Sequence, residues 1–206
     1  IKYETGKVAT AFYEGTAPNE CKVRENHRNG DCMYFLGKQG RERAARMVGD
    51  DHHVYYFMGD KGEERLYKKH AKGSRSCSYY EGSPGRERLV REEGNYIRHY
   101  KGARRREYMV SRRELGEGAV EYFEGKRRGD ERLVKRVFPW GKEIRFHGSA
   151  GYESVASVHW PEEGLVHVYA GNKGQERLVE TKRADGTRQL FVGPRNEERK
   201  VRTVLP

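Results

Sequence analysis

The sequence predicts an all-β fold, an elongated single-layer antiparallel meander of about nine tandem β-hairpins. An aromatic-x-Gly triplet recurs nine times along the 206 residues. A Glu follows each triplet glycine by five or six positions. No stretch combines a sustained 3.6-residue period with helix caps, so essentially no helix is expected.

The triplets set the repeat. Successive triplet glycines are 22, 22, 23, 20, 23, 23, 23 and 22 residues apart, and a fixed period of this length indicates a repeat architecture. We expect one tandem-repeat domain over residues 1–206, with units starting near residues 10, 32, 54, 77, 97, 120, 143, 166 and 188. The triplets are Tyr13-Glu14-Gly15, Phe35-Leu36-Gly37, Phe57-Met58-Gly59, Tyr80-Glu81-Gly82, Tyr100-Lys101-Gly102, Phe123-Glu124-Gly125, Phe146-His147-Gly148, Tyr169-Ala170-Gly171 and Phe191-Val192-Gly193.

Each unit is expected to form one hairpin. A run such as residues 77–81 is rich in β-forming residues and too short for a helix. A turn such as Asp60-Lys61-Gly62 follows, with its glycine in the left-handed region. The repeated Glu then opens a return strand, usually followed by Arg and two apolar residues, as in Glu87-Arg88-Leu89-Val90.

The repeated residues have expected structural roles. Adjacent aromatics such as Tyr79 and Tyr80 point to opposite faces of a strand, so both faces of the sheet carry rings. The triplet glycine leaves a gap that a neighbouring ring covers. The repeated Glu accepts hydrogen bonds from turn amides or pairs with an Arg of the next unit to form a ladder.

Composition favours a binding module in a reducing compartment. The chain has 42 Lys+Arg against 31 Asp+Glu, a net charge of +11, which suits an anionic partner or a solvated basic surface. Three cysteines do not make a disulfide framework, so an intracellular, cytoplasmic location is expected. No apolar run approaches the ~18 residues that span a bilayer, so no transmembrane segment is expected.

At its Tyr-Glu-Gly triplets the chain resembles the MORN-repeat family. The triplet stands unaltered at residues 13–15 and 80–82, and the later glycine of a unit, such as Gly94, fits the family's hairpin. The chain departs from that family on the return strand, where Glu-Arg-Leu-Val replaces Gly-x-Gly. The resemblance implies an elongated β structure that scaffolds proteins, dimerises or contacts phospholipid headgroups.

A group of ten cations is the first candidate binding site. Two basic turns fall at the same place in consecutive units, and two basic pairs follow on the return strands of those units. The group suits phosphate binding or, alternatively, a solvated edge that discourages aggregation. Its members are Arg104, Arg105, Arg106, Arg112, Arg113, Lys126, Arg127, Arg128, Lys135 and Arg136.

Aromatic residues between units are the second candidate site. Phe138 and Trp140 fall in one turn and Trp160 in the next, where other units carry polar residues. Such rings anchor a partner or dip into a lipid interface, or they pack locally on one another. All three are expected at the strand ends opposite the basic turns.

No catalytic or cofactor motif is present, so no enzyme activity and no cofactor are expected. Asp50-Asp51-His52-His53 is the densest group of possible metal ligands, but it falls in a turn, and no metal site is expected. Cys21 and Cys32 flank a hairpin turn and are expected to be free thiols. The leading function is a protein-interaction scaffold, and the alternative is binding of a phosphoinositide membrane surface or nucleic acid through the ten cations.

Overall fold

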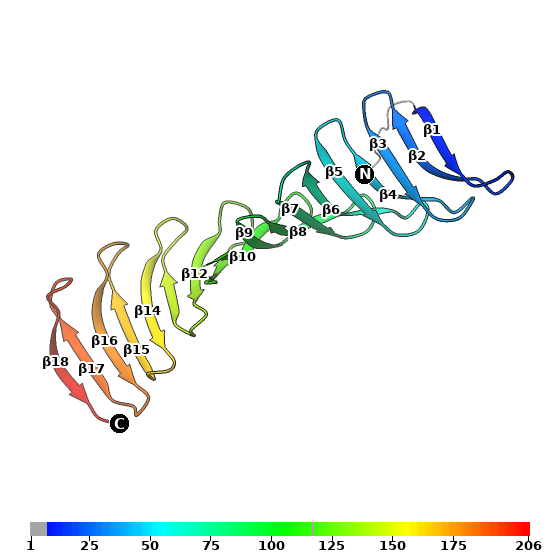
Figure 1. Cartoon of the computed structure of the whole chain (residues 1–206). Helices are drawn as coiled ribbons and strands as arrows, with labels where there is room; N and C mark the ends of the chain where they lie inside the picture. Colours follow the sequence, from blue (N-terminus) through cyan, green and yellow to red (C-terminus); the bar gives the residue numbers. More distant parts are fainter. Residues whose placement is uncertain (1–7, 117) are drawn as a thin grey trace. The chain divides into compact units, whose positions relative to one another are not determined.

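A computed structural model describes residues 8–116 and 118–206 and confirms the all-β prediction. These residues contain eighteen β-strands and no helix, and therefore no helix able to cross a membrane. The strands divide between two compact units, one ending at Glu107 and one running from Tyr108 to Pro206 (Figure 1).

The first unit contains nine strands, and each pairs antiparallel with the next strand in the chain. They are β1 (Val8–Glu14), β2 (Cys21–His27), β3 (Cys32–Leu36), β4 (Arg43–Val48), β5 (His53–Met58), β6 (Arg65–Ala71), β7 (Cys77–Glu81), β8 (Arg88–Glu93) and β9 (Tyr96–Lys101).

The second unit is also an antiparallel meander of nine strands. They are β10 (Tyr108–Glu114), β11 (Val120–Glu124), β12 (Arg132–Val137), β13 (Glu143–His147), β14 (Ser154–Trp160), β15 (Leu165–Ala170), β16 (Arg177–Arg183), β17 (Arg188–Val192) and β18 (Arg199–Val204).

The triplet glycine begins the turn of the hairpin, but its structural role differs from the predicted one. Gly59 has φ +117°, and a Cβ there would lie 2.5 Å from the carbonyl oxygen of Glu63. The triplet glycine therefore permits a close backbone approach instead of leaving a gap for a ring. The second turn glycine, Gly62, has φ +85° with open space around it, which confirms the expected left-handed conformation.

Cross-strand partners place the triplet aromatics of each unit on one face of the sheet, which we call the triplet face. Phe57 lies opposite Leu66, and both side chains are buried. Met33 and Met47 complete the buried cluster. Among the described residues, no side chain is less than 2 % exposed, as a sheet with no second layer requires.

Eight hairpins in the described part of the chain contain a β-bulge on the return strand: β1–β2, β3–β4, β5–β6, β7–β8, β11–β12, β13–β14, β15–β16 and β17–β18. In β5–β6, Tyr56 lies opposite Lys68 and Phe57 opposite Leu66, so Tyr67 is the extra residue. Neighbouring hairpins pair over a shorter length. Between β4 and β5 the register runs only from Arg46 opposite Tyr56 to Val48 opposite Val54, so the first residues of each return strand have no neighbouring strand on one side.

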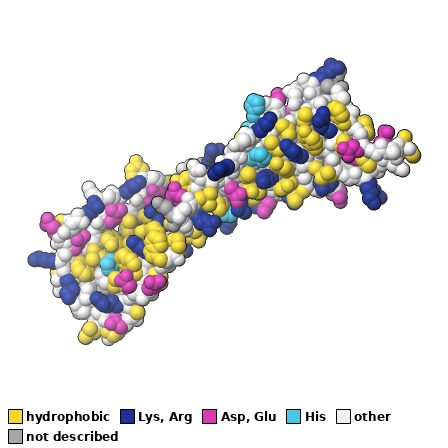
Figure 2. All heavy atoms as spheres, viewed as in Figure 1, with side chains coloured by type: hydrophobic (Ala, Val, Ile, Leu, Met, Phe, Trp, Pro, Cys, Tyr) yellow, Lys and Arg dark blue, Asp and Glu magenta, His cyan; other side chains and the backbone are white. Residues whose placement is uncertain are grey.

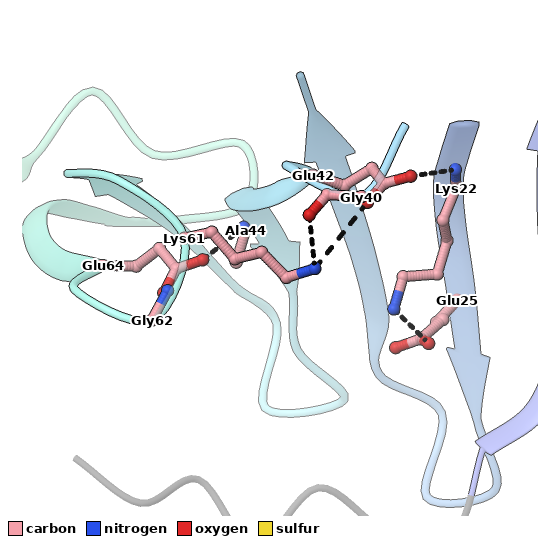
Figure 3. Close-up of polar contacts among 8 residues, drawn as sticks. All are labelled: Lys22, Glu25, Gly40, Glu42, Ala44, Lys61, Gly62 and Glu64. Atoms are coloured by element: carbon pink, nitrogen blue, oxygen red, sulfur yellow. Dashed lines mark hydrogen bonds and ion pairs between the residues drawn. The ribbon is translucent and has the colours of Figure 1, made fainter. Parts of the chain in front are cut away.

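The repeated Glu fills that gap. Glu64 accepts a hydrogen bond from the backbone N–H of Ala44 in the preceding hairpin at 3.1 Å and one from Gly62 in its own turn at 2.8 Å (Figure 3). The predicted bond to a turn amide is thus confirmed. In place of a ladder of Arg pairs, the described residues show Lys61 approaching Glu42 at 3.9 Å.

This contact recurs through both units. Among the described residues, eight carboxylates accept the amide of a preceding hairpin at 3.0 to 3.4 Å, and we call them the clasp glutamates. They are Glu42, Glu64, Glu87, Glu107, Glu131, Glu153, Glu176 and Glu198.

Candidate functional site

The face opposite the triplet face carries a row of alternating aromatic and cationic side chains in the first unit. The residue before each triplet aromatic points to this face, because successive residues of a strand alternate. Each is directly opposite a cation on the return strand, and that cation is opposite the next aromatic. The cation–aromatic row consists of Phe12, Arg24, Tyr34, Arg46, Tyr56, Lys68, Tyr79 and Arg91, one residue from each of β1–β8.

Cations lie over the rings along the whole row. The guanidinium of Arg24 is 4.1 Å from the Phe12 ring centroid, and that of Arg46 is 5.3 Å from Tyr34. Lys68 lies between two rings, with Nζ 5.6 Å from both Tyr56 and Tyr79. Each such contact is worth ~0.5–1 kcal/mol at an exposed site, so the contacts favour this arrangement of the row.

The four cations of the row differ in their charged partners. Among the described residues, Arg24, Arg46 and Lys68 form no ion pair. The Nε atom of Arg24 is buried and lacks a hydrogen-bond partner within the described part of the chain. Arg91 differs because it pairs with Glu93.

Tyr79 is fixed as a neutral donor. Its hydroxyl donates to Glu93 at 2.7 Å. That hydrogen bond, with burial second, raises the pKa of Tyr79 to about 12. At neutral pH the row therefore presents three unneutralised cations and no ionised phenol from Tyr79.

More cations and exposed apolar side chains share this face nearer the triplet turns. Arg43 lies opposite Leu36 and Arg65 opposite Met58. Leu36 is 59 % exposed and Met58 38 %. Hydrophobic and Lys or Arg side chains are interleaved over the first unit in the space-filling view (Figure 2).

The second unit does not keep the row. The register that contains Tyr122 and Lys135 continues through Arg145 to Ser157 and Val168, and then through Glu180 and Leu190 to Arg202. The same hairpins form with these residues. The cation–aromatic row is therefore not required by the repeat, in contrast to the triplet aromatics and clasp glutamates.

The return-strand cations of the ten-residue group divide between the two faces. Arg112 and Arg136 lie on either side of the buried carboxylate of Glu121, to which their Nε atoms donate at 2.8 and 3.1 Å. The register places Lys135 and Arg113 on the other face, where Lys135 is 3.7 Å from Glu143. These four cations therefore do not form one surface, and three have carboxylate partners.

The turn cations belong to different units. Arg104, Arg105 and Arg106 are exposed in the first unit, and the Arg104 guanidinium donates to the Gly85 carbonyl. Lys126, Arg127 and Arg128 are exposed in the second unit, where Arg127 pairs with Asp130 at 2.7 Å.

Arg105 has a strained backbone. Its φ is +64°, at the turn position where Gly62 and Gly85 stand in other hairpins. With Lys69 and Tyr80 it lines a hollow of about 380 Å³ on the triplet face. Strain of this kind at a non-glycine residue costs ~1–2 kcal/mol.

The aromatic residues between units pack partly on one another. The Phe138 and Trp140 ring centroids are 4.9 Å apart. Trp160 is the last residue of β14 instead of a turn residue, and its ring lies 4.7 Å from His167. Trp140 remains 59 % exposed, so local packing accounts for Trp160 better than for Trp140.

The possible metal ligands at residues 50–53 and the two cysteines that flank the β2–β3 turn do not form a binding site within the described residues. Asp51 accepts hydrogen bonds from the His53 amide at 3.0 Å and the Tyr55 hydroxyl at 2.5 Å. Within residues 8–116 and 118–206, no three His, Cys, Asp or Glu side chains gather as metal ligands. Cys21 lies opposite Glu14 and Cys32 opposite Asn26, so the two thiols do not face each other, and both are free.

The sequence contains a signal for the row, although it is not one of the known binding motifs. Four residues after the repeated Glu, the first four units carry Arg24, Arg46, Lys68 and Arg91, whereas later units also carry Ser or Glu there. No protein-family model and no curated protein matches the chain.

Proposed function

We propose that this chain is a non-catalytic, MORN-like repeat scaffold that binds a protein partner through the face carrying the cation–aromatic row. One observation carries the proposal: the first unit maintains this row over eight strands, at positions where the second unit shows that the hairpins form without it. Interleaved aromatic and Arg side chains are typical of protein interfaces.

Site-directed photo-crosslinking tests this proposal. A photoreactive residue at Met58 lies beside the row, and one at Val192 occupies the same repeat position in the unit without the row, with similar exposures of 38 % and 42 %. In nuclease-treated lysate of the source cell, we expect protein adducts from the Met58 position and not from Val192. Arg46→Glu with Lys68→Glu should reduce them about tenfold, because reversing two interface charges costs more than 1.4 kcal/mol.

A matched pair of charge reversals controls for net charge. Arg28 and Arg75 are exposed turn residues of the same unit, so Arg28→Glu with Arg75→Glu changes the net charge equally without touching the row. This variant should keep the adducts. Equal adduct yields from the two photoreactive positions, or equal loss in the two charge variants, contradict the proposal.

Binding of a phosphoinositide surface or nucleic acid through the basic turns is the second candidate. The strained backbone of Arg105, beside exposed Arg104 and Arg106, favours it. We expect Arg104→Glu with Arg127→Glu to abolish such binding, and wild-type affinity to fall steeply between low and moderate salt. Sedimentation with anionic vesicles and filter binding of an oligonucleotide measure the two ligands separately, and unchanged binding in the variant rules this candidate out.

A further inference from the structure

The cations of the row have a fixed spacing. Arg24, Arg46, Lys68 and Arg91 lie on every second strand, β2, β4, β6 and β8. Adjacent strands are ~4.8 Å apart, so successive cations are ~9.6 Å apart along a line perpendicular to the strands. Tyr34, Tyr56 and Tyr79 occupy the strands between them.

A polyproline II segment matches this spacing. It has three residues per turn and rises ~3.1 Å per residue, so every third side chain points the same way after ~9.3 Å. Over three steps the mismatch with the cations is ~1 Å. An α-helix with an acid at every seventh residue repeats at ~10.5 Å, so its mismatch with the cations reaches ~3 Å over three steps. An extended β-strand points every third side chain to the opposite side, so its acids cannot all face the row.

The chemistry of the row indicates what the segment carries. Arg24, Arg46 and Lys68 have no acid of their own within the described residues. A carboxylate on the partner supplies the missing counter-charge, because cationic side chains pair with carboxylates through charge-assisted hydrogen bonds. Tyrosine rings between the cations suit proline, which docks on aromatic-lined surfaces.

We infer that the row binds a polyproline II segment with an acidic side chain at every third residue, running across β2–β8. The inference rests on the proposed function for the face that is used, and it adds the partner's conformation and charge period. Six strand spacings cover ~29 Å, which corresponds to about ten residues of such a segment. Arg24, Arg46 and Lys68 make the principal contacts, because Arg91 already pairs with Glu93.

Two fluorescent peptides of identical composition test the period. One carries Glu-Pro-Pro repeats closed by a final Glu, and the other gathers the same glutamates at one end, followed by the prolines. By fluorescence anisotropy with the whole chain, we expect the periodic peptide to bind at least about tenfold more tightly, since its acids reach separate cations. Arg46→Glu with Lys68→Glu should remove the difference, and Arg28→Glu with Arg75→Glu should retain it.

A conservative variant guards against misfolding. Arg46→Gln with Lys68→Gln removes both charges while keeping long polar side chains, and it should lose the periodic preference with an unchanged circular dichroism spectrum. Equal binding of the two peptides, or binding of neither, overturns the inference. Tighter binding of a single-stranded oligonucleotide that displaces the periodic peptide also overturns it.

The two proposals fail separately. Protein adducts at Met58 that depend on Arg46 and Lys68 support the proposed function even if neither peptide binds. If those adducts are absent while the periodic peptide is preferred, the polyproline II inference is supported and the proposed scaffold function in that cell is contradicted.

Discussion

Gly59→Ala should lower the free energy of unfolding by about 3 kcal/mol. The added Cβ would lie 2.5 Å from the Glu63 carbonyl oxygen, at a φ of +117°. Backbone strain of this kind costs ~1–3 kcal/mol, and forcing the turn apart adds a comparable overpacking cost. Urea unfolding followed by circular dichroism measures the change.

Gly62 provides the matched control three residues later. Its φ is +85°, but a Cβ there meets nothing within 4 Å, so Gly62→Ala should cost only about 1 kcal/mol. Gly62→Asn should cost less still, because Asn tolerates this region, as Asn196 does with φ +64°. Equal costs at Gly59 and Gly62 would show that the close carbonyl approach does not matter.

Removing a clasp carboxylate should cost nearly as much. Glu87 and Leu66 are both buried, at 6 % exposure each, and the Leu66 amide donates to Glu87 at 3.2 Å. Glu87→Ala leaves that amide without an acceptor, so we expect a loss of about 2–3 kcal/mol in urea unfolding. Exposed Glu162→Ala should stay within ~0.5 kcal/mol, and a comparable loss there would contradict a specific role for the clasp.

The clasp also makes stability pH-dependent. Burial raises the pKa of Glu87, but hydrogen bonds from the backbone amides of Glu87, Gly85 and Leu66 outweigh it and hold the pKa below the ordinary 4.5. A lowered folded-state pKa contributes stability that is complete above the ordinary pKa and is lost as pH falls through the folded value. The wild type should therefore lose stability progressively below ~pH 5, with a shallower dependence in Glu87→Ala.

The repeat architecture was predictable because its cause is local. A glycine at a positive φ ends the first strand, as at Gly59, and a second one forms the turn, as at Gly62. Both conformations disfavour other residues, so the sequence has to display them. The hydrogen bond that Glu64 accepts from the Gly62 amide was predictable for the same reason, because the two residues are only two positions apart in the sequence.

The other clasp contact depends on the short pairing between neighbouring hairpins, and the cation–aromatic row depends on the bulge. Neither feature is marked by a particular residue type in the sequence. In a regular hairpin with Tyr80 opposite Leu89, Tyr79 would lie opposite Val90. The extra residue places Arg91 there instead. The sequence shows the cations, but a regular hairpin register pairs each row aromatic with the residue before the cation. The row could therefore not be predicted without knowing that the bulge is present.

The division of the return-strand cations has the same origin. Arg112 and Arg113 are neighbours in sequence, as are Lys135 and Arg136, and pattern alone placed all four in one group. Alternation of side chains sends Arg112 and Arg136 to Glu121 and the other two to the opposite face. A buried acid such as Glu121 is the signal that would have separated them.

The clasp has a consequence for how such a chain changes length. Each hairpin supplies a carboxylate to the hairpin before it and an unpaired amide to the hairpin after it, as Glu64 and Leu66 do. A hairpin duplicated in frame therefore brings both the carboxylate and the amide that a new clasp contact needs. When a hairpin is deleted, its two neighbours still supply a matching amide and carboxylate. Gene segments encoding whole units can be gained or lost while every remaining junction stays chemically complete.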